Sequence, residues 1–189
     1  MMFRPLALCL CLFVAPAVAQ EEAPLAPSDP PDNPRIGALI GEIEWGVYCA
    51  QDPVRLEDAP DTAAGTINIV QELPQIRFED TVVPAALGMG FGVLARVAEG
   101  TDPGPVTVTV THPPYPGSGI TVERWIATMD DTAMSLFGFS FETQEELVTG
   151  TWTLIAEADG EELFHIRFEI VPPDFARPMV AACQGGFMS

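Results

Sequence analysis

The sequence predicts an all-β protein that folds as an antiparallel sandwich of about eight strands. Apolar and polar residues alternate along most of the chain, and no segment keeps a sustained helical period. Turn signals rich in proline and glycine recur roughly every dozen residues. Short strands at this spacing are typical of a sandwich or a barrel, and the size of the folded part favours the sandwich.

Three segments show the strand pattern most clearly. Residues 106–111 alternate valine with threonine, as expected for a strand buried on one face only. Residues 152–156 and 164–170 alternate in the same way, and Trp152 lies on the apolar face, so we expect it in the core. Asp159-Gly160 between these two runs is a strong hairpin signal. The pair therefore predicts an antiparallel ribbon.

Weaker strand candidates precede these three. They share an apolar alternation interrupted by turn residues, and they comprise residues 40–48, 65–72, 91–98, 120–127 and 135–141. The glycine-rich run 88–92 leads into the third of them, where it predicts a bulge or bend.

The amino terminus has the three parts of a secretory signal. Arg4 is followed by the apolar run 6–14, and Ala17 and Ala19 occupy the small positions of a cleavage site, so cleavage is expected after Ala19. An uncleaved anchor is the alternative, although the run is short for a bilayer. The cleavage point has no cysteine, which argues against lipidation, and no later stretch predicts membrane insertion of the mature chain. The expected location is periplasmic or secreted.

Beyond the signal (1–19), three further regions are expected. Residues 20–35 are rich in proline and acid, which predicts a disordered linker. Residues 36–171 form the sandwich, and 172–189 form a carboxyl-terminal tail. No internal repeat is visible.

The chain is strongly acidic, with a formal net charge of −19. Such a surface repels phosphate backbones and anionic lipid heads, which argues against nucleic acid and membrane surfaces as partners. It is compatible with a basic protein partner or with loosely held divalent cations. The alternative is that the charge only keeps an exported protein soluble.

Cys49 and Cys183 are the cysteines that remain after the expected cleavage. An even pair in an oxidising compartment predicts a disulfide, which ties the tail back to the end of the first strand. So long a loop gives about 5 kcal/mol in the chain-entropy model. Two free thiols or a metal pair are the alternatives, but two sulfurs without a nearby histidine make a poor metal site.

No catalytic, cofactor-binding or metal-binding constellation stands out. No nucleophile elbow is present, and His112 at a strand end is expected to brace the following turn rather than act as a base. Asp130-Asp131 with Glu123 upstream is a candidate calcium group, although no calcium-binding loop motif surrounds it. We therefore predict no cofactor and no enzymatic activity.

Trp125, Arg124 and His112 form a candidate contact surface. If Val122 and Ile126 face inward, Trp125 faces outward beside Arg124 and could serve as a binding hot spot. The alternative is a strand bulge that turns Trp125 into the core.

Several short motifs resemble an uncharacterised family of exported bacterial proteins, a domain of unknown function. The segments that resemble the family are residues 146–153 (ELVTGTWT), 83–92 (VPAALGMGFG), 112–114 (HPP) and 46–48 (GVY). The resemblance spans roughly residues 40–171, and the tail looks like an addition to the family pattern. It implies an exported, immunoglobulin-like sandwich, and it implies no activity.

The leading hypothesis is thus a non-enzymatic binding or interaction module, whose partner could be an envelope protein. Sheet edges recruit extended segments by strand addition. Two alternatives stay open: a structural accessory domain of an envelope complex, and a glycan-binding or glycan-active domain. A glycan site would show an aromatic-lined groove flanked by carboxylates, and a surface-exposed Trp125 would favour it.

Overall fold

The computed structural model describes residues 33–185. The expected signal at 1–19 and most of the expected linker at 20–35 lie outside the described residues. Asn33 nevertheless belongs to the fold, because its side-chain amide donates to the carbonyl of Arg167 (2.9 Å) and accepts from the amide of the same residue (2.7 Å). Arg35 begins a strand. The fold therefore begins a few residues earlier than the composition predicts.

Eleven strands and three short helical elements make up the described part. In chain order they are β1 (Arg35–Ile36), β2 (Ile40–Cys49), β3 (Arg55–Asp58), β4 (Thr66–Ile69), β5 (Val82–Pro84), β6 (Met89–Val97), β7 (Val106–Thr111), β8 (Val122–Ala127), β9 (Ser135–Ser140), η1 (Gln144–Glu146), β10 (Gly150–Ala158), β11 (Glu161–Val171), η2 (Pro173–Ala176) and α1 (Arg177–Gln184).

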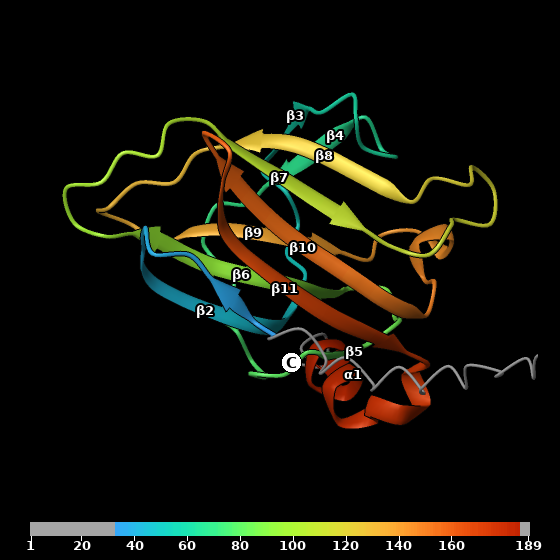
Figure 1. Ribbon diagram of the computed structural model, residues 1–189. Helices are drawn as coiled ribbons and strands as arrows, with labels where there is room; N and C mark the ends of the chain where they lie inside the picture. Colours follow the sequence, from blue (N-terminus) through green and yellow to red (C-terminus); the bar gives the residue numbers. More distant parts are fainter. Residues whose placement is uncertain (1–32, 186–189) are drawn as a thin grey trace, which may run out of the picture. The chain divides into compact units, whose positions relative to one another are not determined.

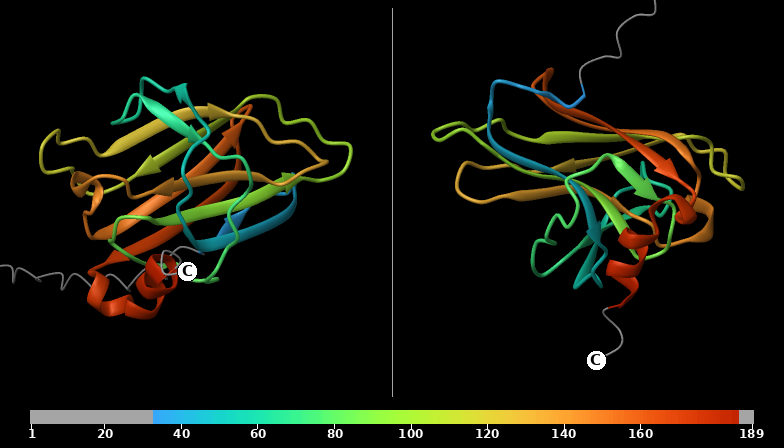
Figure 2. Two further views of the ribbon diagram at one scale, coloured as in Figure 1. Left: turned by 180° about the vertical axis from the view of Figure 1, so that it is seen from behind. Right: turned by 90° about the horizontal axis from the view of Figure 1, so that it is seen from below.

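The strands form two packed sheets and a separate hairpin (Figures 1 and 2). The larger sheet has the order β1-β11-β10-β7-β8, and the smaller sheet has the order β2-β6-β9. Strands β3 and β4 pair only with each other. Every described strand pair is antiparallel except β5 with β11, which is parallel. The structure thus confirms the predicted all-β antiparallel sandwich.

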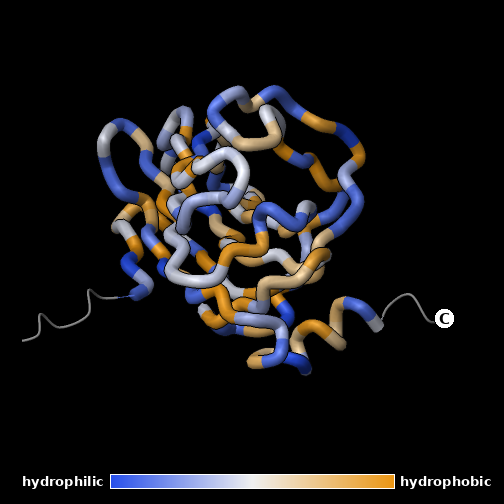
Figure 3. Tube along the Cα trace, turned by 90° about the vertical axis from the view of Figure 1, so that its right-hand side faces the viewer, coloured by the Kyte–Doolittle hydropathy of each residue, from blue (hydrophilic) through white to orange (hydrophobic). Residues whose placement is uncertain are grey.

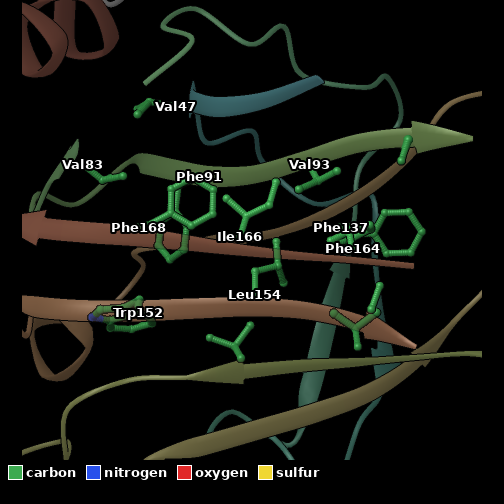
Figure 4. Close-up of a cluster of buried hydrophobic side chains, with 14 of the residues drawn as sticks. Val47, Val83, Phe91, Val93, Phe137, Trp152, Leu154, Phe164, Ile166 and Phe168 are labelled. Atoms are coloured by element: carbon green, nitrogen blue, oxygen red, sulfur yellow. The ribbon is translucent and has the colours of Figure 1, made fainter. Parts of the chain in front are cut away.

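Aromatic side chains fill the space between the sheets (Figure 4). The Phe91 ring on β6 lies 4.9 Å from that of Phe168 on β11 and 5.6 Å from that of Trp152 on β10. Phe137 on β9 meets Phe164 at 5.5 Å. All five side chains are fully buried, which confirms the expectation for Trp152. Each contributes about 2–3 kcal/mol of hydrophobic stabilisation.

Alternation in the sequence locates the long strands because one face of each strand is buried. Hydropathy changes from residue to residue along the trace in Figure 3, and the eight predicted strands correspond to eight observed ones. Strands β1, β3 and β5 were not predicted. They are two to four residues long and lie in no longer alternating run, whereas the four-residue β4 lies inside the predicted run 65–72.

Both predicted backbone irregularities are present. Asp159 and Gly160 have φ values of 53° and 82°, as the two-residue turn between β10 and β11 requires. Gly88 has a φ of 79°, and its amide donates to the carbonyl of Phe141 (3.1 Å). The Phe141 amide donates to Met89 (2.9 Å), so Gly88 and Met89 together oppose one residue. This is a β-bulge that uses glycine at its first position.

The two sheets differ in width. The aromatic contacts place β6 over β11 and β9 over β10 and β11, so no described strand of the smaller sheet lies over β7 and β8. The β3–β4 hairpin and its connecting loop lie beside β8 instead (Figures 1 and 2). The Asp61 carbonyl accepts from the Arg124 amide at 3.0 Å, which fixes the loop against the edge of β8.

The tail folds back onto the sandwich through a short helix and a disulfide. Met179, Val180 and Cys183 of α1 share one helix face and pack against the core. Cys183 is bonded to Cys49 at the end of β2, with the two Cα atoms 5.2 Å apart. The predicted disulfide is therefore present. No helix among the described residues is long and apolar enough to cross a membrane.

We expect loss of the disulfide to destabilise the domain without changing its fold. The bond closes a loop across a sequence separation of 134 residues, so Cys49→Ser with Cys183→Ser should lower the free energy of unfolding by about 2–5 kcal/mol. Urea titration of the oxidised protein and of this variant measures the difference. A reducing agent should lower the stability of the unaltered protein and leave the variant unchanged, and equal midpoints for both oxidised proteins would contradict the expectation.

Candidate functional site

A groove of about 500 Å³ opens where the narrower sheet ends. One wall is β9, and every residue of that strand except Phe137 lines the groove. The other walls are β8 and the β3–β4 hairpin with the segment that follows it. The groove is thus a direct consequence of the unequal sheets, because the hairpin covers the overhanging strands only partly.

Trp125 lies in this groove, in an arrangement that neither sequence-based alternative predicted. Strand β8 pairs with β7 in unbroken register, so it has no bulge. Val122 and Ile126 face outward and are 38% and 62% exposed, whereas Glu123 and Trp125 face the interior. Trp125 packs against the core and is half-buried, because no strand of the smaller sheet covers it.

The groove is lined by four carboxylates, from Glu57, Glu123, Glu142 and Glu146, and by one guanidinium, from Arg55. Arg55 is already paired with Glu57. Glu146 accepts from the amides of Glu142 (2.6 Å) and Thr143 (2.9 Å), and burial raises the pKa of its carboxyl. The electrostatic character of the groove is therefore negative.

Tyr48 lines the groove from the outer face of the smaller sheet. Its ring lies over Gly90 and Gly138, where any Cβ atom would come within 2.6 Å of Tyr48 atoms. The hydroxyl donates to the carbonyl of Phe139 at 3.3 Å, and burial raises the pKa of Tyr48 to about 12. It therefore remains a neutral hydrogen-bonding group at physiological pH.

Glu123 also belongs to a buried polar cluster. Its Oε1 accepts from the Tyr115 hydroxyl (2.7 Å), and its Oε2 accepts from the Ala63 amide (2.8 Å). His112 Nε2 lies 3.4 Å from Oε1, which is an ion-pair contact rather than an aligned hydrogen bond. The His112 ring stacks on Tyr115 (4.1 Å) and on Trp152 (4.5 Å), whose ring centroids are 6.2 Å apart.

His112 braces the turn that follows β7. Its Nδ1 lies 2.8 Å from the Pro113 carbonyl oxygen, which only accepts, so Nδ1 bears the proton and donates to it. This is the bracing role that the sequence predicts for His112.

The candidate contact surface of Trp125, Arg124 and His112 is not a single surface in this structure. Arg124 is exposed on the outer face of β8, opposite Trp125. The His112 side chain has no exposed area, so the fold removes it from any contact with a partner. Alternate residues of a strand point to opposite faces, and this separates Arg124 from Trp125.

The candidate calcium group is also divided. Asp130 Oδ1 accepts from Thr132 and Ala133, while Asp131 accepts from the Gly100 amide (2.7 Å). Glu123 is held in the His112 cluster. Among residues 33–185 no group of three or more His, Cys, Asp or Glu side chains is placed to hold a metal ion.

Fold and site together define an acidic β-sandwich with a groove at its open side. The chain belongs to a family described as a domain of unknown function (DUF3859), whose model matches residues 37–170. This confirms the family resemblance seen in the sequence motifs. No curated protein matches the sequence.

A solved structure is similar to the chain: an immunoglobulin-like protein, PA1606, from Pseudomonas aeruginosa. The two share 22% sequence identity with a TM-score of 0.44, and the match covers 74% of this chain and 98% of the other.

The buried cluster predicts a specific acid sensitivity. Burial raises the pKa of Glu123, but the neighbouring His112 ring, the Ala63 amide and the Tyr115 hydroxyl outweigh it and hold the pKa below its usual value. A lowered pKa stabilises the fold above the usual carboxyl range, and this stabilisation is lost as the pH falls through the folded-state value. Glu123→Gln should therefore cost about 3 kcal/mol at pH 7.

Urea unfolding of both proteins between pH 7 and pH 3 measures this difference, which should shrink towards the acid end. Glu57→Gln is the matched control, because Glu57 is a partly exposed groove carboxylate outside the cluster, and it should leave the profile unchanged. A constant difference between Glu123→Gln and the unaltered protein at every pH would refute the lowered pKa of Glu123.

Proposed function

We propose that this protein is a non-enzymatic binding module that works outside the cytoplasm and holds its ligand in the groove between β8, β9 and the β3–β4 hairpin. The observation that carries the proposal is the half-buried Trp125 in an acidic groove of about 500 Å³. Pockets that combine apolar walls with a few polar groups are the usual sites of ligand binding.

A binding role fits the chemistry of the site better than catalysis does. The buried His112–Glu123 pair joins a potential base to a carboxylate at the wall of the groove, but the His112 side chain has no exposed area. A general base must come within hydrogen-bonding reach of the group from which it takes a proton. The pair therefore supports the fold at the wall of the groove.

The extracytoplasmic location is supported by two independent features. Residues 1–19 have the pattern of an export signal. The Cys49–Cys183 disulfide is of a kind that forms and persists in oxidising compartments.

A glycan-binding groove is the second candidate. Trp125 lines the same groove as the carboxylates of Glu123 and Glu142, and an aromatic ring with carboxylates is the combination that a sugar site uses. Sugar rings stack on open aromatic faces, however, and Trp125 packs against the core with part of its surface.

Photocrosslinking from the groove tests the proposed function. Replacing Ile126, which is 62% exposed at the groove, with p-benzoylphenylalanine in tagged full-length precursor should give one discrete adduct in intact cells of the native host. Adding Trp125→Ala should weaken binding by about 30-fold and remove the adduct, because truncating a buried aromatic anchor costs about 2 kcal/mol or more.

The same crosslinker at Phe175 is the control position. Phe175 is 79% exposed in η2 and does not line the groove, so it should not give the same adduct. Identical adducts from both positions, or an adduct that survives Trp125→Ala in a folded protein, would refute binding in the groove.

The redox state of the two cysteines tests the location. In the native host, Cys49 and Cys183 of the full-length precursor should resist thiol alkylation until a reductant is added, because export leads to oxidation. A chain that lacks residues 2–19 should remain in the cytoplasm with both thiols free to react. Alkylation of the full-length protein in unreduced cells would contradict an oxidising location.

A further inference from the structure

We infer that the groove takes an extended basic peptide of a partner protein, which adds as a new strand to the outer edge of β9. This inference rests on the proposed function and specifies the ligand. It requires a free main-chain edge, space beside that edge and a charge that selects a basic segment, and each is visible in the described residues.

The edge of β9 offers free main-chain groups. The Phe141 amide donates to the carbonyl of Met89 in β6. This hydrogen bond shows which residues of β9 direct their main-chain groups towards β6. Phe139 and Phe137 lie two and four residues earlier, opposite Phe91 and Val93, so they also bond to β6. The amides and carbonyls of the intervening Leu136, Gly138 and Ser140 therefore point away from β6. Within residues 33–185 no strand pairs with that side of β9.

Strand β8, at the opposite wall, is less open. The amide of Arg124, in the middle of β8, already donates to the Asp61 carbonyl. The neighbouring Glu123 carboxylate accepts from the Ala63 amide. The hairpin loop thus already covers part of this edge. Natural proteins protect sheet edges in this manner, whereas β9 has no such cover among the described segments.

The groove provides space beside β9 along its whole length. Ser135, Leu136, Gly138, Phe139 and Ser140 all line it. A strand that matches the six residues of β9 is about 20 Å long. Its side chains would alternate between the interior, near Trp125, and the outer face, near Leu136. An apolar residue at every second position suits this environment.

The charge of the groove selects a basic occupant. Four carboxylates line it against one arginine that is already paired, and the whole chain carries a net charge of −19. The protein's own residues 1–32 contain four acidic residues and one basic residue, so their charge does not complement that of the groove. A segment that alternates basic and apolar residues meets both the electrostatic and the apolar requirement.

Hydrogen exchange measured by NMR on the full oxidised domain tests the inference, with an octapeptide that alternates arginine and valine as the probe. At saturation the amides of Leu136, Gly138 and Ser140 should exchange at least about tenfold more slowly, because each gains a strand partner. Phe137 and Phe139, already bonded to β6, should change little. Binding that protects none of the three outward amides would overturn strand addition.

Two further comparisons separate main-chain pairing from simple charge attraction. Methylating the peptide nitrogens at alternate residues removes the donors along one edge of the peptide, so one of the two methylation phases should abolish binding and the other should preserve it. Equal loss or equal retention in the two phases would contradict pairing. An octapeptide that alternates glutamate and valine should not bind.

Proline substitutions identify the edge. Leu136→Pro removes one outward donor of β9 and should weaken the arginine–valine octapeptide about tenfold or more. Val122→Pro removes an outward donor of β8 at a position that does not line the groove, and it serves as the matched control with unchanged affinity. The opposite result would place the peptide on β8 and overturn the inference. If Leu136→Pro does not fold, the exchange measurement on the unaltered domain still decides.

The two proposals can fail separately. A discrete adduct from Ile126 in cells without protection of the β9 amides by the peptide would keep the groove as a binding site but reject strand addition. A carbohydrate in that adduct would select the glycan candidate. Loss of the adduct altogether would remove the proposed function, and the inference with it.

Discussion

The unequal width of the two sheets is the constraint on which the rest of this structure depends. The smaller sheet ends at β9, while the larger sheet continues through β7 and β8. The inner face of β8 consequently has no sheet opposite to it. The chain covers it with the β3–β4 hairpin and with polar contacts from the hairpin loop to Glu123 and Arg124. The groove, the half-exposed Trp125 and the buried cluster all follow from this single mismatch.

The buried cluster shows how an overhanging strand can carry a charged residue towards the interior. Glu123 occupies an inward position that would face a second sheet in a symmetrical sandwich. Here it receives two hydrogen bonds and lies 3.4 Å from His112 Nε2, and it is only 4% exposed. A buried charge is tolerated only when it is paired and hydrogen-bonded, so the cluster joins β8 to the start of the loop after β7.

The sequence could predict the fold because alternation depends only on which face of a strand is buried. The eight predicted strands were accessible in this way, while turn residues indicated the Asp159-Gly160 turn and the bulge at Gly88, and the even cysteine pair indicated the disulfide. The orientation of β8 was not, because its outward face carries Val122 and Ile126 and its inward face carries Glu123. Hydropathy therefore predicts the opposite orientation of β8. The observed orientation is possible because the hairpin, rather than a sheet, covers the inner face of the strand.

The candidate site was correspondingly harder to predict than the fold. Trp125 could be identified as a large aromatic residue in a strand with broken alternation, and it does line the groove. Nothing in the sequence distinguished Glu142 and Glu146 from the many other carboxylates as groove residues. Tyr48 likewise could not be distinguished from a tyrosine in the core. The free edge of β9 has no sequence signature, since it depends on which strands lack a neighbour in the folded sheet. The sequence did contain one signal. Glu123 alternates with Trp125 and Ala127 on one face of the strand, and an acidic residue on an inward face indicates that a buried group binds its carboxylate.

The disulfide has a topological consequence beyond its effect on stability. It joins the end of β2 to the terminal helix, so the covalent ring contains every strand from β3 to β11. A single peptide-bond cleavage in an exposed connection, such as the loop between β6 and β7, opens this ring without releasing a fragment. The two pieces stay covalently attached and their strands stay paired. Proteolytic damage at one site therefore leaves a nicked molecule rather than two separate chains.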